Sequence, residues 1–536
     1  MLYTMKRSII VIVAMAAATA HAQTVNDGIK MYNYARYASA EKILAPLATA
    51  NPLANYYFGL SQLEENNVEG AKATFGKFPD DAANIAGQAR VAYYQNNMAG
   101  ALQLATNAAN KAKKKEWQPL EYAGDAITYS DNVTDPAALQ QAITWYKKAL
   151  ESTDDANVHI GLGDAYLKLA GGGGDAMNNY EHVTEKDLKN SLAFSRIGAL
   201  WYAARNYPSA LDNYEKAKQA DPTNPIPYRD LANAYERVGK YDQSLQNMQQ
   251  YLQLSDKSVD DQVQYVEILY LSKHDSAAAK SADSLINLGV RKPGLYGILG
   301  YSQFNIQDTA NALKNARVYF NTQDNKKITY SDYVMYGKIF SSNSMADSAD
   351  YYYGKAAAMD TAKDKSDLYR PIAEGFKAQK NYPKAATWYN RIITENPGAQ
   401  PSDYFWAGAM YYYAKDYPNG ASIFEKMEAK YPDQPSATYW RGRVAAAIDN
   451  EAKEGTAAPF FIKWLGIVNN APDKKGDIKI AEEYLLLYSF NKKDKENEEK
   501  YKKAILEIDR DDNMVKQINA VEAAPAKPAK AAPKKK

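Results

Sequence analysis

Residues 365–397 read KSDLYRPIAEGFKAQKNYPKAATWYNRIITENP, and residues 401–432 read PSDYFWAGAMYYYAKDYPNGASIFEKMEAKYP. Both stretches place an apolar or small residue just before a small residue, Ala373 or Gly408, and an aromatic residue three positions after it. At steps of 34 to 36 residues, or multiples of them, the same pattern surrounds three further small residues: Gly198, Ala232 and Gly337. A period in this range predicts an array of stacked helix pairs and not one globular core.

The second half of each unit repeats as regularly as the first. A second small residue stands twelve positions after the first, followed four positions later by a large one: Ala210 and Tyr214, Ser244 and Met248, Ala349 and Tyr353, Ala385 and Tyr389, Gly420 and Phe424. Small residues let two helices approach closely, and the large side chain fills the space beside them. Turn signals separate the halves: Arg205–Tyr207, Val238–Lys240, Gln379–Asn381 and Ala414–Asp416. Each unit is therefore predicted to be a helical hairpin.

The order and spacing of residue types in these units resemble the tetratricopeptide repeat. The order is a leucine or aromatic residue, a glycine, an aromatic residue, an alanine, a second aromatic residue and a proline. The resemblance is most specific in the units that start near residues 190, 224, 329, 365 and 401. It implies an all-α, right-handed solenoid of about fourteen helix pairs. It also implies a concave groove, lined by the first helix of each pair, that binds peptides or proteins without catalysis.

Length sets how much of the chain this repeat explains. Without a leader of 22 residues and a tail, about 498 of the 536 residues remain, which is room for fourteen or fifteen units. Weaker units fill the intervals, with small residues at Gly59, Gly124, Gly163 and Gly300. The predicted organisation is a signal peptide at 1–22, an N-terminal array at 23–255, divergent repeats at 256–328, a C-terminal array at 329–518 and a disordered tail at 519–536.

The first 22 residues have the pattern of an export signal. Lys6 and Arg7 precede an apolar run at 9–18, and Ala20–Ala22 has the small-x-small pattern of a cleavage site. The mature chain is expected to begin at Gln23. No later stretch has the roughly twenty apolar residues that cross a bilayer, so no membrane span is expected after cleavage.

The chain contains no cysteine. This composition excludes disulfides, a thiol nucleophile and the modified cysteine of a lipoprotein. The predicted location is the periplasm or the periphery of the outer membrane, with secretion beyond that membrane as the alternative.

Charge points to no nucleic-acid partner. Removing Lys6 and Arg7 from the net charge of +2 leaves the mature chain near zero. The end of the chain, at 523–536, contains only alanine, proline and lysine and is expected to stay unfolded. Two roles remain open for this tail: weak contact with anionic envelope polymers or lipids, and a solvated spacer.

Catalytic signals are sparse. His159, His182 and His274 are expected to lie in different units and lack the paired spacing of a metal site, although the first two bracket one unit and could meet in space. Gly171–Gly174 lacks the Gly-Lys-Ser or Gly-Lys-Thr of a phosphate loop, and Asp154–Asp155 lacks the pattern of a calcium loop. We predict no catalytic residue, no metal and no cofactor.

The tetratricopeptide resemblance places ligand contacts on the first helix of a unit, three residues before and one and four after the small residue. In two units these positions give the predicted groove residues: Arg229, Asn233 and Glu236, with Arg237 beside them, and Arg370, Glu374 and Lys377. Tyrosines away from the signature positions are further surface candidates, and Tyr202 and Tyr412 complete the predicted site. The expected partners are other envelope proteins or peptides.

Arg229 and Asn233 also resemble half of the clamp with which some family members bind a peptide carboxylate. The next unit offers Gln262 and Gln264 but no matching basic residue, so a complete clamp is not predicted. Two other functions remain open: a peptidoglycan-associated accessory factor, and a glycan hydrolase built as a closed helical barrel around paired carboxylates. The second is disfavoured because tetratricopeptide stacking leaves the array open at its end.

Overall fold

A computed structural model describes residues 24–469 and 471–523. The predicted signal peptide and the tail beyond Ala523 lie outside the described residues. Within the described part, the elements are α-helices with two short 3₁₀ helices, which confirms the predicted all-α solenoid. None of its helices combines the length and apolar character that crossing a membrane requires.

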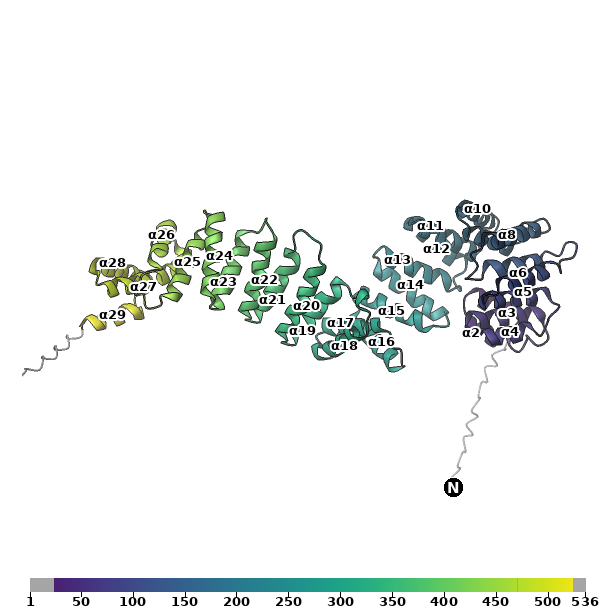
Figure 1. Ribbon diagram of the computed structural model, residues 1–536, viewed down its shortest axis with the longest axis horizontal. Helices are drawn as coiled ribbons and strands as arrows, with labels where there is room; N and C mark the ends of the chain where they lie inside the picture. The colour runs from purple at the N-terminus through teal and green to yellow at the C-terminus, as the bar shows by residue number, and fades with distance from the viewer. Residues whose placement is uncertain (1–23, 470, 524–536) are drawn as a thin grey trace, which may run out of the picture. The chain divides into compact units, whose positions relative to one another are not determined.

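The chain divides into two compact units, the first ending at Ser302 and the second beginning at Gln303. Figure 1 follows the helices in chain order. The first unit contains α1 (Val25–Asn33), α2 (Tyr37–Leu44), α3 (Pro52–Glu64), α4 (Val68–Phe75), α5 (Ala82–Tyr94), α6 (Met98–Ala109), α7 (Gln118–Thr128), α8 (Pro136–Leu150), α9 (Ala156–Leu167), α10 (Gly173–Lys186), α11 (Ser191–Ala203), α12 (Tyr207–Ala220), α13 (Ile226–Arg237), α14 (Tyr241–Leu254), α15 (Val259–Leu271), α16 (Asp275–Asn287) and most of α17 (Pro293–Asn305).

The second unit continues the same alternation. It contains α18 (Thr309–Thr322), η1 (Asn325–Lys327), α19 (Tyr330–Ser342), α20 (Ala346–Met359), α21 (Ser366–Ala378), α22 (Tyr382–Glu395), α23 (Pro401–Tyr413), α24 (Tyr417–Lys430), α25 (Pro435–Ile448), α26 (Ala458–Val468), η2 (Pro472–Lys474), α27 (Lys475–Lys492), α28 (Lys495–Ile508) and α29 (Asn513–Ala523). The last helix, α29, overlaps the start of the segment predicted as a tail. Helices α1 to α28 make fourteen consecutive pairs in the described residues, as the repeat length predicts.

In several predicted units the small residue packs against the aromatic residue sixteen positions later. A Cβ added at Gly198 would lie 2.6 Å from the ring of Tyr214, and one added at Gly408 would lie 2.6 Å from the ring of Phe424. The weaker unit at Gly163 makes the same contact with Tyr180. Any side chain at these glycines would collide with a buried ring. The glycines of the repeat pattern therefore lie where the two helices of a pair approach each other most closely.

The predicted turns also have one conformation in common. Arg205, Gly239, Lys380 and Lys415 all have left-handed backbone, with φ between 58° and 74°. The following residue then caps the second helix where it is Asn or Asp: the Asn206 side chain, for example, accepts a hydrogen bond from the backbone N–H of Ser209 at 3.2 Å. A single left-handed residue followed by an N-cap therefore reverses the chain within each pair.

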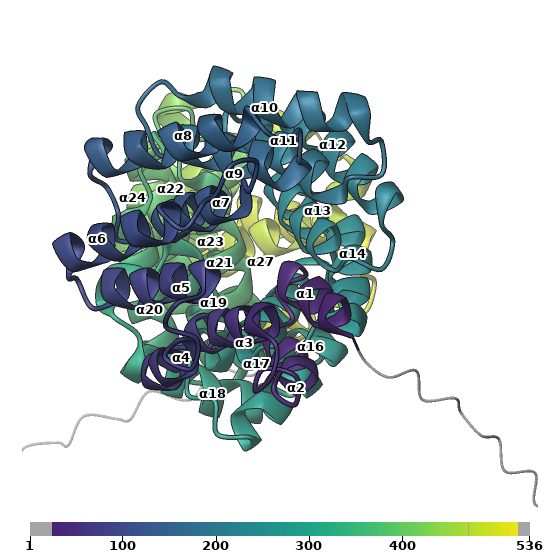
Figure 2. The same cartoon turned by 90° about the vertical axis from the view of Figure 1, so that its right-hand side faces the viewer.

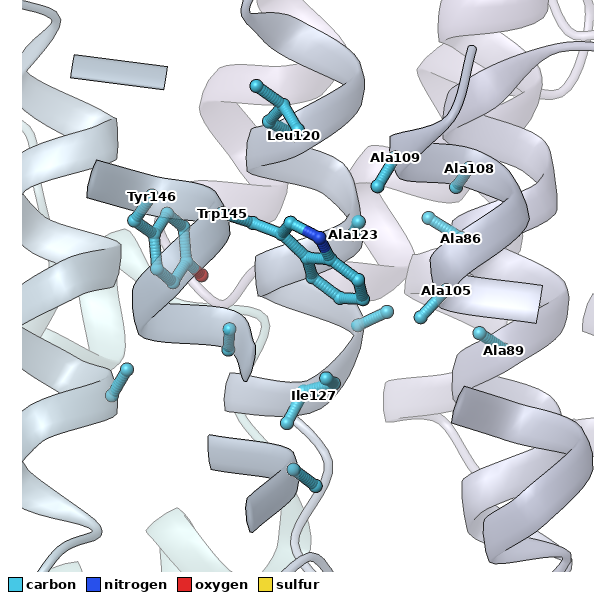
Figure 3. Packing of buried hydrophobic residues seen from close by; sticks show 14 of the residues in the cluster. Ala86, Ala89, Ala105, Ala108, Ala109, Leu120, Ala123, Ile127, Trp145 and Tyr146 are labelled. Carbon is cyan, nitrogen blue, oxygen red and sulfur yellow. The ribbon is translucent and has the colours of Figure 1, made fainter. Parts of the chain in front are cut away.

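Alanine and large aromatic residues share the core of the first unit. Figure 3 shows alanines of α5 and α6 on one side of α7, Tyr146 of α8 on the other side, and the ring of Trp145 lying over α7 next to Ala123. Tyr146 is fully buried, and its ring lies against Gly124 and Gly161. One aromatic ring thus fills the space between successive pairs.

Contacts between its first hairpin and later loops close the first unit on itself. At the α1–α2 turn, Tyr34 donates a hydrogen bond to Asp221, which follows α12. Arg36 forms a 3.1 Å salt bridge with Asp256, just after α14, and the backbone N–H of Ser39 donates to the same carboxylate at 3.0 Å. Figure 2 looks onto this unit and shows α1 next to α14. Tetratricopeptide stacking was expected to leave this end open. The repeat signature reflects only contacts between neighbouring units and carries no information about this closure.

Candidate functional site

A hollow of about 680 Å³ lies among α11, α12, α13 and α14 of the first unit. We call it the α13 hollow because α13 supplies most of its polar side chains. Its lining consists of Tyr202, Tyr214, Asp230, Asn233, Glu236, Arg237 and Tyr241. Four of the residues predicted for the groove, Tyr202, Asn233, Glu236 and Arg237, therefore lie around one cavity.

Helix α13 places these side chains together because they recur at helical spacing. Glu236 and Arg237 follow Asn233 by three and four residues, so all three lie on the same side of the helix. Ala232, on a different face, is fully buried. The small residue thus packs the helix into the array, while its neighbours in the sequence point toward the hollow.

Neighbouring repeats hold two of the polar groups in place. The Asn233 Oδ1 atom accepts a 2.6 Å hydrogen bond from Gln264 of α15, an arrangement that turns the N–H groups of the Asn233 amide away from Gln264. Arg237 donates from Nε to the hydroxyl of Tyr207 at 3.2 Å, and the Tyr207 ring contacts Tyr202 edge to face at 5.5 Å. The hollow therefore offers both donors and acceptors on a preorganised wall.

Acidic groups give the hollow a negative side. Burial raises the pKa of Asp230, and Arg229, 3.4 Å away, opposes this effect. On α15, burial raises the pKa of Glu267, and the charge of Glu236 raises it further. Arg229, which was predicted to line the groove, is instead directed to Asp230 and holds that carboxylate at the edge of the cavity.

The predicted residues of the second unit make contacts between helices. Arg370 of α21 pairs with Asp403 of α23, whose side chain is only 1% exposed. Glu374 accepts a hydrogen bond from Tyr389, and the ammonium of Lys377 lies 3.8 Å from the centre of the Trp406 ring.

Tyr412 has a similar role within the second unit. Its hydroxyl accepts a 3.3 Å hydrogen bond from Arg443, and its ring contacts Trp440. The four predicted residues of this unit thus connect neighbouring helices. None of them lines the α13 hollow.

Sequence reasoning missed a row of buried ionisable residues on the first helices of the first unit. Burial raises the pKa of Glu121 to about 9, with further contributions from Asp125 and Asp155. Asp164 accepts hydrogen bonds from Tyr180, at 2.5 Å, and from Arg196. The sequence contained a signal for two of these residues. Glu121 and Asp125 lie three positions before and one position after Gly124, the same offsets from the small residue that selected Arg229 and Asn233.

Comparison with known proteins gives repeat proteins of the same kind. No family model and no curated protein matches this sequence. The C-terminal part of a TPR repeat-containing protein from Cytophaga hutchinsonii shares 24% identity over 48% of this chain and 98% of its own, with a TM-score of 0.34. A tetratricopeptide repeat protein from Parabacteroides merdae shares 18% over 46% and 97%, with a TM-score of 0.31. YrrB, a TPR protein with an unusual peptide-binding site, shares 14% over 38% and 97%, with a TM-score of 0.30. Each likeness covers less than half of this chain and concerns the fold alone.

Proposed function

Because the chain is built of tetratricopeptide-type helix pairs, we propose that it is a non-enzymatic scaffold of the bacterial cell envelope that binds an extended segment of a partner protein in the α13 hollow. The observation that carries this proposal is the convergence of four predicted groove residues on one cavity. An extended peptide presents backbone N–H and C=O groups alternately, and a wall with both donors and acceptors satisfies both. The acidic side, with Asp230 and Glu236, favours a segment that carries lysine or arginine.

Substitution of the hollow residues tests the binding proposal. The double variant Asn233→Ala/Glu236→Gln removes a donor and a charge without touching the buried small residues. In affinity purification from the envelope fraction of the source bacterium, we expect it to lose a protein that the unaltered chain retains.

The matched control makes the same two changes on an exposed surface of the first unit, at Asn178 and Glu185 of α10. This control is expected to retain the partner. Identical sets of retained proteins for both variants would exclude the α13 hollow as the binding surface.

The envelope location rests on the leader-like sequence at 1–22 and has its own test. We expect the protein from the envelope fraction to begin at Gln23, as read by mass spectrometry of its N-terminal peptide. A chain that keeps its first residues and fractionates with the cytoplasm would contradict the location without affecting the binding proposal. The accessory role on peptidoglycan predicts instead retention on purified wall material that is lost when residues 523–536 are removed.

Two buried carboxyl groups in the first unit give a reason to test the hydrolase alternative. The first unit is closed on itself, and its inner helices carry Glu121 and Asp125, whose pKa values burial raises. A carboxyl that stays protonated near neutral pH can act as a general acid. Release of sugar from envelope glycans by the pure protein, abolished in Glu121→Gln, would support this function; no release from either protein would exclude it.

A further inference from the structure

Three side chains from separate parts of one repeat meet at its edge in the first unit. His159 of α9 and His182 of α10 lie with their ring centres 4.1 Å apart. Their Nε2 atoms approach the same atom, Oδ1 of Asp154 in the loop before α9, at 3.0 and 2.8 Å. All three potential ligand atoms lie within 4.8 Å of one another. The sequence alone predicted no metal site here, because these residues lack a recognisable spacing.

A fourth residue sets the orientation of one ring. The amide of Asn179 donates from Nδ2 to the backbone carbonyl of Asp175 at 2.8 Å, so its Oδ1 atom faces His159 as an acceptor. The His159 Nδ1 atom lies 3.1 Å from this oxygen and therefore carries the proton that it donates. In the neutral ring, Nε2 then presents a lone pair toward Asp154.

This arrangement brings a lone pair of His159 and a carboxylate oxygen face to face, with the second imidazole beside them. A positive charge between these atoms, carried either by a proton on Nε2 or by a bound metal ion, relieves the repulsion. A histidine that donates one N–H to an amide oxygen and offers its other nitrogen is also the usual form of a metal ligand. We propose that Asp154, His159 and His182 form a binding site for a divalent transition-metal ion of the Zn²⁺ class.

The dimensions fit such an ion. Zinc–nitrogen and zinc–oxygen bonds of about 2.0 Å place tetrahedral ligand atoms about 3.3 Å apart. The two Nε2–Oδ1 distances, 3.0 and 2.8 Å, lie a few tenths of an ångström below that value, and all three ligand atoms lie within 4.8 Å of one another. Two imidazole nitrogens and one carboxylate oxygen leave a fourth position for water. The bound ion would connect the α8–α9 loop, α9 and α10, and so clamp the two helices of one repeat.

Lys186 does not occupy the ligand atom. Its ammonium contacts Oδ2 of Asp154, whereas both histidines approach Oδ1. The Lys186 side chain is 58% exposed and sits on a flexible stem, so it can move toward water when a cation binds. Its positive charge nevertheless competes with the metal. Removal of this charge is therefore expected to strengthen metal binding, whereas removal of a ligand weakens it.

Calorimetric titration of the untagged full chain with Zn²⁺ tests the site. We expect one high-affinity ion per chain, and affinity at least roughly tenfold lower in His159→Gln, in His182→Gln and, through loss of ring orientation, in Asn179→Ala. Lys186→Gln is expected to bind Zn²⁺ more tightly. Weaker binding in that variant would contradict the assignment of Oδ1 as the ligand atom.

His274→Gln is the matched control, because this histidine lies in another repeat and its Nδ1 lies 3.0 Å from the backbone oxygen of Ser272 in its own turn. Its Zn²⁺ affinity should equal that of the unaltered chain. Far-UV circular dichroism verifies that every variant is folded. The visible spectrum of bound Co²⁺ gives an independent readout of nitrogen and oxygen ligation. Absence of a high-affinity ion, or equal affinity in the histidine variants and the control, would overturn the proposal.

Discussion

At the scale of single residues, the first helix of each repeat carries two kinds of polar side chain. Some, such as Asn233 and Glu236, line a cavity, while others, such as Glu374 and Lys377, are held against neighbouring helices. The two kinds occupy the same offsets from the small residue of their unit. Which role a side chain takes depends on the residues that the adjacent repeats place opposite it.

Glu121→Gln is expected to stabilise the fold at pH 8 and to have no effect at pH 4. Burial raises the pKa of Glu121 from 4.5 to about 9 in the folded chain, so the unfolded chain loses this proton first as pH rises. The carboxyl therefore destabilises the fold increasingly above pH 4.5, and the neutral amide removes a cost of at least ~1 kcal/mol. Thermal unfolding at both pH values measures the difference, with exposed Glu116→Gln as the control. Equal stabilisation at both pH values would refute the explanation.

Arg370→Gln is expected to destabilise the second unit by about 1–3 kcal/mol, because it leaves the buried carboxylate of Asp403 without its ion pair. Lys338→Gln, on the exposed side of α19, should change stability little. Denaturant unfolding of Arg370→Gln, Asp403→Asn and the double variant measures the coupling. Strictly additive effects would show that the two side chains do not interact.

At the scale of elements, several helix pairs are held by one large ring packed against a small residue of the partner helix. The contact of Gly198 with Tyr214 recurs as Gly337 with Tyr353, and a left-handed residue reverses the chain in between. Because every pair packs mainly on its neighbours in the chain, damage to one pair should spread to adjacent pairs first.

Tyr389→Ala is expected to cost about 3–5 kcal/mol, since this fully buried ring of α22 packs on both α21 and α23. Hydrogen exchange should accelerate first in those three helices. Tyr351→Ala, at a ring that is 58% exposed, is the control and should leave the exchange pattern nearly unchanged. Uniform acceleration along the whole second unit would contradict packing by nearest neighbours.

At the scale of the whole molecule, the chain forms two units, and the first is closed by contacts between residues more than 180 positions apart. Asp256 is central to this closure. Burial raises its pKa, but hydrogen bonds from Ser39 and Arg36 outweigh that effect and hold the pKa below the ordinary 3.8. The closing contacts are therefore fully present above pH 3.8 and are lost as pH falls through the lower folded value.

Asp256→Ala is expected to open the first unit at neutral pH. The chain has no cysteine, so spin labels on introduced Lys42→Cys and Val259→Cys report one distance by electron paramagnetic resonance. We expect a narrow distance distribution in the unaltered background and at Asp242→Asn, an exposed control. The distribution should be broad in Asp256→Ala and, in the unaltered background, at pH 2. A narrow distribution in Asp256→Ala would show that other contacts hold the unit closed.

The sequence by itself determined the helix pairs, their turns and their number. These features depend on local spacing, since Gly198, Arg205, Ala210 and Tyr214 lie within one repeat, where the Tyr214 ring packs on Gly198. The offsets from Ala232 also identified Asn233 and Glu236 of the α13 hollow. Only the tertiary structure decided that the first unit closes on itself, that Arg370 forms an ion pair with Asp403, and that His159 and His182 meet at Asp154. Such contacts depend on the cumulative rotation from repeat to repeat and on side-chain direction, and a periodic pattern records neither quantity.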